Sequence, residues 1–390
     1  MDIDKRNILV LSVAQGLSIT ATNINMINTG LVGTILARDP SYATLPLSLQ
    51  FLTIAITLIP VSLLMGKIGR RPMFLIGAMA AFIGCLIIAF SIFNKVFSLF
   101  IFGSILLGFS QANQQFYRYA AADNVSTKLK SKAISLVLAG GLIAAIIGPE
   151  VSRYSFDFFS DYIYLASYLC AALIQIFNFW VLIFVKIKKP KQTKNSVRAL
   201  SKILLRKTVI IAILAASVGY SLMSFIMTAT PLQIVNVCKL GDSASATVIQ
   251  WHVIAMFAPS FFTGSIINLL GNRKVMMMGV MLYIMSICFG IMGQTIQYFW
   301  ISLFLCGLGW NFLYVGGSDI IAKSALPEER AKVQGVTDFI IFIFVASGSF
   351  LAGSLHNNLG WEIMMLYTSI PIFILFLSIV FINPREIRAN

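Results

Sequence analysis

Uncharged polar side chains recur at helical spacing inside segments of the chain that are otherwise long and apolar. In the first such segment, residues 8–36, they stand three and four positions apart and share one helical face: Gln15, Ser18, Thr22, Asn25 and Thr29. An unpaired amide is costly to bury in hydrocarbon, so this face must turn toward protein or water. Amides and hydroxyls that face water can hold a polar organic solute by hydrogen bonds.

Three later apolar segments carry comparable polar faces. Their side chains include Gln114, Ser217, Ser221 and Thr228, beside aromatic rings that suit an amphipathic solute. From all four faces we predict one solute cavity lined by Thr22, Asn25, Asn28, Gln111, Gln115, Tyr220, Ser224, Trp310, Asn311 and Tyr314. Hydrogen bonding between helices is the alternative role of the same side chains, and the sequence leaves it open.

Catalytic patterns are weak in this chain. Asp319 and Asp338 could in principle form an intramembrane aspartyl protease, but their surroundings, GGSD and GVTD, lack the flanking pattern of such enzymes. The zinc-protease pattern HExxH and the nucleophile pattern GxSxG do not occur in the sequence. The five cysteines show no metal or disulfide spacing. We therefore expect no enzyme, no metal site and no cofactor.

The elements that must position these side chains are membrane-spanning helices. The chain is 58% hydrophobic and 11% charged, whereas soluble proteins carry about 25% charged residues. We predict an all-α integral membrane protein with twelve transmembrane helices, each long enough to cross about 30 Å of hydrocarbon. The predicted spans are 8–36, 43–65, 73–93, 96–120, 133–154, 163–185, 208–231, 247–269, 275–292, 298–321, 333–355 and 363–382.

Basic residues fall almost entirely on one side of these spans. The stretch 186–207, KIKKPKQTKNSVRALSKILLRK, contains no acidic residue and separates the sixth span from the seventh. Of the 29 Lys and Arg, the opposite side holds only Arg38, Lys95, Arg153 and Lys239. Because Lys and Arg accumulate on the cytoplasmic side, we expect both termini and 186–207 in the cytoplasm and the protein in the cytoplasmic (inner) membrane. Flanking spans argue against a nucleic-acid partner.

Ionisable side chains inside or beside the spans are few. Arg118 is the basic residue that falls within a span, near its cytoplasmic end. We predict a cytoplasmic gate in which Asp123 and Asp338 pair with Arg70, Arg71 or Arg118 when that side closes. The remaining groups that could couple transport to protons are Glu150, His252 and Asp319; Glu150 can alternatively pair with Arg153, one helical turn away.

Landmarks repeat at the same places in the two parts of the chain. Gly69–Arg71 follows the second span and Gly271–Lys274 follows the eighth, while Lys130–Lys132 opens the fifth span and Arg330–Lys332 opens the eleventh. Such symmetry is typical of secondary transporters built from two repeats of like orientation. We therefore divide the chain into two pseudo-symmetric six-helix bundles, 1–185 and 208–390, joined by the basic linker 186–207.

Three stretches of the sequence resemble a known family. The loop after the second span resembles the pattern G-x-x-x-D-R-x-G-R-R of the major facilitator superfamily: Gly69–Arg71 matches, while Gly66 and, in the second repeat, Asn268 stand at the acidic position. Gly148 and Pro149 resemble part of an exporter motif of that family. The stretch 116–123, FYRYAAAD, is similar to a bacterial branch associated with riboflavin-type vitamin uptake.

The resemblance implies a transporter that works by alternating access, with the first, fourth, seventh and tenth spans around a central cavity. We expect a monomeric permease in the lipid bilayer that moves a small polar or amphipathic organic solute, with a proton as a second candidate partner. The alternatives are a proton-coupled multidrug exporter and a non-transporting membrane receptor.

Overall fold

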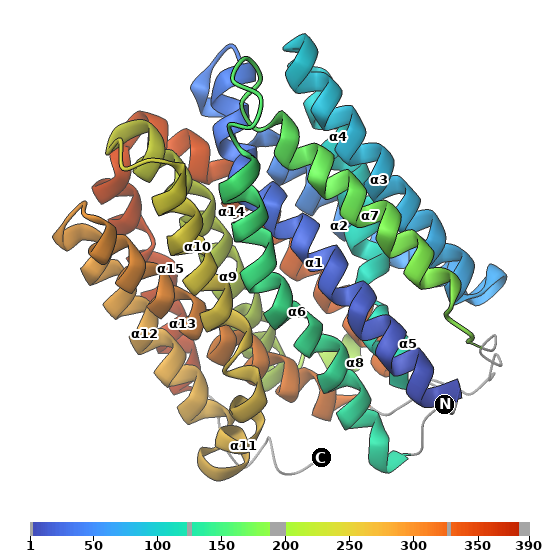
Figure 1. Cartoon of the computed structure of the whole chain (residues 1–390). Helices are drawn as coiled ribbons and strands as arrows, with labels where there is room; N and C mark the ends of the chain where they lie inside the picture. The colour runs from blue at the N-terminus through green and yellow to red at the C-terminus, as the bar shows by residue number, and fades with distance from the viewer. Residues whose placement is uncertain (1–2, 123–126, 188–199, 326–328, 382–390) are drawn as a thin grey trace.

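The computed structural model of the chain consists of helices and their connections in all the residues that it describes, 3–122, 127–187, 200–325 and 329–381. The helices run roughly side by side through the molecule (Figure 1). We call residues 3–187 the first half and residues 200–381 the second half. Asp123 of the predicted gate lies outside the described residues.

The first half begins with α1, the long helix that carries the first polar face. Its elements are α1 (Ile3–Leu36), the 3-10 turn η1 (Pro40–Tyr42), α2 (Leu45–Ile68), α3 (Arg70–Asn94), α4 (Phe97–Gln114), α5 (Tyr117–Ala122), α6 (Thr127–Ser155) and α7 (Leu165–Ile183). The predicted fourth span, 96–120, is thus two helices, because the backbone turns at Gln115 and Phe116.

The second half opens with a short helix inside the predicted linker. Its elements are α8 (Leu200–Leu204), α9 (Lys207–Pro231), the π-helix η2 (Leu232–Val237), α10 (Asp242–Phe257), α11 (Ser260–Leu270), α12 (Asn272–Met292), α13 (Ile296–Ser324), α14 (Arg330–Tyr367) and α15 (Ser369–Val380). The predicted eighth span, 247–269, is bent by 43° between α10 and α11. Pro259 stands at this break and lacks the N–H that a continuous helix would use.

The last two predicted spans are divided differently from the expectation. The sequence prediction leaves residues 356–362 as a connection between the last two spans. In the structure, the helix continues to Leu359, breaks at Gly360 and resumes at Trp361. Gly360 has φ +77°, a left-handed conformation that glycine adopts without steric strain. In the described part of the chain, eight helices are long and apolar enough to cross a membrane, or nine with the bent α10–α11 pair, so the count of twelve stays a prediction.

The two glycines that end the second and eighth predicted spans adopt the same backbone conformation. Gly69 has φ 99° and ψ 161°, and Gly271 has φ 85° and ψ 153°. Each separates a helix from one that begins at the next residue, so both sharp turns need a residue without Cβ. This local agreement supports the repeat inferred from the sequence.

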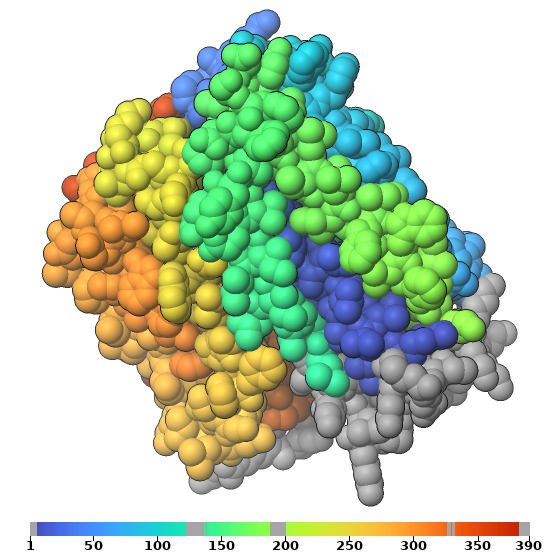
Figure 2. Space-filling model, in the orientation of Figure 1, coloured from blue at the N-terminus to red at the C-terminus, as the bar shows by residue number. Residues whose placement is uncertain are grey.

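Each half has its own apolar core. Two buried clusters draw mainly on the first half and include Phe51, Phe74 and Tyr168, whereas a third lies almost wholly in the second half around Tyr283 and Phe299. The halves meet where α6 packs on α10 and where α2 packs on α14. Figure 2 shows the first of these contacts as the green and yellow surfaces that run beside one another.

The described residues Lys186 and Lys207, at either end of the linker sequence, lie at the end of the molecule where α1 begins, which we call the terminal end; the opposite end is the distal end. Asn7 near the start of α1 donates to the Lys186 carbonyl over 2.8 Å. Lys207, the first residue of α9, lies 5.7 Å from the ring centre of Phe381, just past α15. The first contact joins the ends of α1 and α7 and the second joins the ends of α9 and α15, and both pairs lie at the same end of the molecule (Figure 1).

The orientation in the membrane is a prediction that labelling can test. In a variant without its five cysteines, single cysteines at Lys95 and Lys239 should react with an impermeant maleimide added outside intact cells, because their loops lie opposite the linker. A cysteine at Lys202 should react only after the cells are opened. Reaction of a cysteine at position 202 with reagent added outside would show that the predicted orientation is wrong.

Candidate functional site

A cavity of about 570 Å³ lies between the two halves. Its volume is in the range that binds small organic molecules. The first half supplies an amide-rich wall from α1 and from the α4–α5 region: Gln15, Thr22, Asn23, Gln111, Gln114 and Gln115. Gln111 donates to the Thr22 hydroxyl over 2.9 Å, which holds these two neighbours of the cavity in place. The Oε1 atom of Gln15 is buried without a hydrogen-bond partner in the described part of the chain.

The second half supplies an aromatic wall. Trp310 and Tyr314 on α13 stack with their rings 9° from parallel and their centres 5.1 Å apart. Tyr220 on α9 packs edge-on against both, at 5.3 Å and 5.5 Å, and also contacts Phe342 on α14 at 5.7 Å. Phe257, at the end of α10, extends the cluster at 6.0 Å from Trp310. The indole Nε1 of Trp310 is buried and has no hydrogen-bond partner among the described residues.

Charged side chains line the cavity toward the terminal end. Arg118 on α5 donates to the Tyr119 hydroxyl over 3.1 Å, and its guanidinium attracts the Asp338 carboxylate on α14. Among the described residues these two charges form no direct ion pair within 4.0 Å. Asp319 on α13 also lines the cavity, but Lys323 and Asn272 bind its carboxylate at 2.5 Å and 2.8 Å. Arg118 and Asp338 are therefore the charges that face each other across the halves.

Six of the residues predicted to face a cavity do line this one: Thr22, Gln111, Gln115, Tyr220, Trp310 and Tyr314. Asn25 and Asn28 do not, and this corrects the prediction. Asn25 donates to Gln50 at 2.8 Å and accepts from Tyr168 at 3.0 Å, while Asn28 accepts from Ser152 at 2.9 Å. Both amides join α1 to neighbouring helices of the same half.

Ser224 and Asn311 also lie outside the cavity lining, contrary to expectation. Ser224 is buried within α9. Asn311 faces the bend between α10 and α11, where it donates to the Met256 carbonyl and the Ser260 hydroxyl, each over 2.7 Å, and accepts from Thr263 at 2.6 Å. These bonds satisfy backbone and side-chain groups at the break of the helix, so Asn311 has a structural position.

The other described residues of the predicted gate and coupling set, Arg70, Arg71, His252 and Glu150, do not line the cavity. Arg70 donates to the Phe116 carbonyl over 3.4 Å but does not line the cavity, and Arg71 is exposed. His252 is fully buried between α10 and α13, with Nδ1 2.7 Å from the Leu303 carbonyl, and does not reach the cavity. Glu150 lies toward the distal end, in a cluster that joins the halves.

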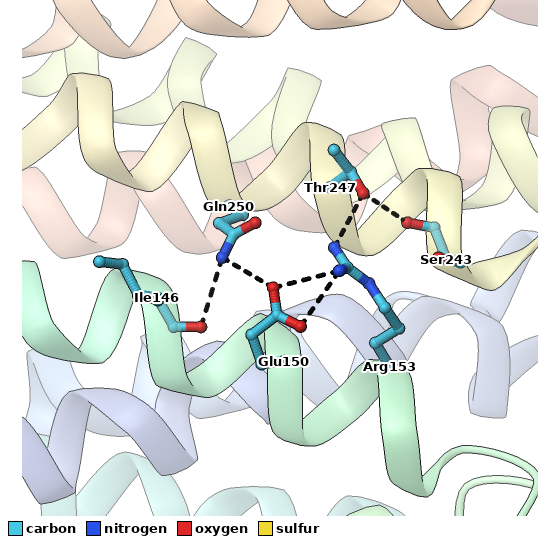
Figure 3. Close-up of polar contacts among 6 residues, drawn as sticks. All are labelled: Ile146, Glu150, Arg153, Ser243, Thr247 and Gln250. Atoms are coloured by element: carbon cyan, nitrogen blue, oxygen red, sulfur yellow. Dashed lines mark hydrogen bonds and ion pairs between the residues drawn. The ribbon is translucent and has the colours of Figure 1, made fainter.

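That cluster connects α6 to α10 (Figure 3). Arg153 contacts both carboxylate oxygens of Glu150 at 3.1 Å, as the sequence alternative for Glu150 predicted. Gln250 of α10 donates to Glu150 over 3.1 Å, and Arg153 donates to the Thr247 hydroxyl of α10 over 2.8 Å. A charged pair within the first half is therefore bonded to two neutral side chains of the second.

Further contacts hold the halves together at the distal end. The Tyr164 hydroxyl donates to Asp242 at the start of α10. On the other side of the molecule, Asn357 of α14 donates to Ser41 over 3.1 Å. A Cβ added to Gly353 would lie 2.5 Å from the Thr44 hydroxyl, so α14 approaches the start of α2 closely there. The cavity is thus closed at the distal end, and its lining reaches the terminal end.

The sequence analysis did not predict several of the residues that line the cavity. Phe342, Thr337 and Gln334 come from α14, whose polar positions are too sparse to mark a face. Phe257 and Ser260 flank the break between α10 and α11. Pro259 is the sequence signal that could have predicted the break beside Phe257 and Ser260. A proline inside an apolar span leaves backbone groups without their helical hydrogen bonds, and these groups must find partners nearby.

Comparison with known proteins gives consistent results across the whole chain. The sequence profile of the Major Facilitator Superfamily matches residues 11–249 and 237–390. The riboflavin transporter RfnT of Brucella anthropi is 38% identical over 362 residues, 92% of this chain and 91% of that protein. The MFS-type transporter YdeG of Bacillus subtilis is 27% identical over 375 residues, 90% of this chain and 85% of that protein.

Solved structures show the same fold at low sequence identity. The nucleoside transporter NupG has a TM-score of 0.73 and the human organic anion transporter MFSD10 one of 0.70; each is 13% identical, and each match covers 96% of this chain and 99% of the other. The profile matches, the full-length relatives and the helical architecture together show that this chain belongs to the Major Facilitator Superfamily, a family of membrane transporters.

Proposed function

We propose that the protein carries riboflavin, or a solute that combines a flat fused ring with a hydroxylated chain, across the cytoplasmic membrane. The observation that carries this proposal is the division of the cavity into an amide wall and an aromatic wall. A flavin ring can stack on Trp310 and Tyr314, while its carbonyl and N–H edge and its ribityl hydroxyls suit the glutamine amides opposite. The 38% identical riboflavin transporter supports the same solute.

Transport proceeds by alternating access between 1–185 and 208–390 around this cavity. The contacts at the distal end and the cavity lining at the terminal end support an inward-facing arrangement, given the predicted topology. Each half contributes one wall, so a solute can contact both walls in the inward-facing and in the outward-facing state. Closure at the terminal end brings Arg118 toward Asp338, and opening at the distal end separates Glu150 and Arg153 from α10.

Uptake of radiolabelled riboflavin in bacteria that lack their own riboflavin synthesis and uptake tests the proposal. Cells that express this chain should accumulate the label and grow on riboflavin concentrations that do not support the parent strain. A parallel measurement with a proton uncoupler shows whether the proton gradient drives uptake. Absence of riboflavin flux from cells in which the protein is present in the membrane would reject the proposed solute.

Replacement of Asp338 by asparagine should trap the carrier in its inward-facing state. The substitution leaves Arg118 without its opposite charge when the terminal end closes; stranding a buried charge costs about 3–5 kcal/mol. Because this cost falls on the outward-facing state, exchange of internal for external solute should slow while binding from the cytoplasmic side persists.

Asp319→Asn is the matched control for this prediction, because Asp319 lines the same cavity but is bonded within its own half. Counterflow in proteoliposomes measures both variants. Equal exchange rates in Asp338→Asn and Asp319→Asn would remove Asp338 from the gate.

A further inference from the structure

A second hollow lies outside the central cavity, at the terminal end of the second half. It is a groove of about 1300 Å³ between α11, α12 and α13. The 43° bend turns α11 away from the line of α10, and α11 lies at the terminal end of the molecule (Figure 1). Nothing in the transport mechanism uses this groove.

Basic side chains line one end of the groove. Arg273 and Lys274, at the start of α12, form no ion pair in the described part of the chain, and Lys274 is exposed. Lys323 of α13 also lines the groove, although it is already paired with Asp319. The local charge is therefore positive, which favours an anionic group such as a phosphate diester.

Apolar side chains continue from this basic end along the groove. Met278, Met281 and Met285 recur three and four residues apart on α12 and are 39%, 52% and 45% exposed. From Lys274 to Met285 the helix rises by about 16 Å. Half of the hydrocarbon thickness of a bilayer is about 15 Å, so the groove from its basic end to Met285 has about the length of one leaflet.

We propose that this groove binds an anionic phospholipid of the leaflet at the terminal end. Arg273 and Lys274 hold the headgroup phosphate, and an acyl chain lies along Met281 and Met285. A groove of leaflet length with positive charge at one end and apolar surface along the rest fits a diacyl phosphate lipid better than a soluble anion, which would use only the charged end. The other end of α11 contributes Ser260 and Phe261 to the central cavity, so an occupied groove holds a helix that also lines the transport site.

Lipid binding to the purified full-length protein tests this proposal without a transport measurement. Native mass spectrometry with dioleoyl-phosphatidylglycerol should show retained lipid, and dioleoyl-phosphatidylcholine should be lost first. Arg273→Gln with Lys274→Gln should weaken phosphatidylglycerol binding roughly 30-fold, since each basic side chain near an anionic lipid contributes roughly a fivefold factor. Met281→Trp should also weaken binding, because it fills the groove while the charges remain.

The charge-matched control is Lys67→Gln with Lys202→Gln. Both lysines are exposed and outside the groove, and this double variant should bind lipid as the unmodified protein does. An equal loss in the control would mean general surface charge instead of a site. Competition by inorganic phosphate, or equal retention of both lipids, would overturn the proposal as well.

Discussion

Replacement of Trp310 by alanine should raise the Kd for riboflavin roughly 5- to 150-fold, the range expected when one stacking ring is removed. Trp310 forms the centre of the aromatic wall, where it stacks on Tyr314 and contacts Tyr220 and Phe257. Trp310→Phe keeps a ring but loses the unpaired indole donor, so its effect should be smaller. Quenching of flavin fluorescence by the purified protein measures the three affinities directly.

Trp251→Ala is the matched control for the loss of an indole ring. Trp251 packs against Trp300, is 42% exposed and lies outside the cavity lining. Its replacement should leave riboflavin affinity unchanged, whereas thermal unfolding measures any common loss of stability. If Trp310→Ala and Trp251→Ala bind riboflavin equally well, the aromatic wall is not the ring site.

Removal of the polar contacts between α6 and α10 should open the distal end. The Glu150–Arg153 pair lies within α6 and survives opening. The α6–α10 bonds that favour closure are those from Gln250 to Glu150 and to the Ile146 carbonyl, and the one from Arg153 to Thr247. Gln250→Leu with Thr247→Val deletes these bonds, two of which are to the charged pair, and leaves that pair intact. Each such bond to a partly exposed charge is worth about 1 kcal/mol, which predicts a shift of the equilibrium toward the outward-facing state by roughly 30-fold.

Spin labels at Tyr154 and Leu240, one in each half near the distal end, report this shift. Their distance, measured by pulsed electron resonance in a cysteine-free background, should gain a longer component in the double variant. Thr295→Val with Asn358→Leu makes the same kind of change in exposed residues that bond only within the second half, and should leave the distance distribution as it was. An unchanged distribution in both variants would show that these bonds do not hold the halves together.

The sequence by itself determined the class of protein and the chemical character of its site. Low charge, long apolar segments and the clustering of Lys and Arg around 186–207 depend on lipid solvation, which acts on each segment independently of its neighbours. The helical spacing of Gln111, Gln115 and Arg118 likewise marks a face that must avoid lipid, and this face does line the cavity. The Gly69 and Gly271 turns follow from local backbone requirements in the same way.

Only the tertiary structure decided which polar side chains face the cavity. Asn25 and Thr22 share a helical face in the sequence, yet Asn25 bonds to Gln50 and Tyr168 while Thr22 reaches the cavity. The penalty for an amide in lipid is removed equally well by another helix or by water, so the sequence cannot distinguish the two. The position of Glu150 against Gln250 and the ring of Phe342 against Tyr220 also depend on how the halves pack, because these contacts join residues far apart in the chain.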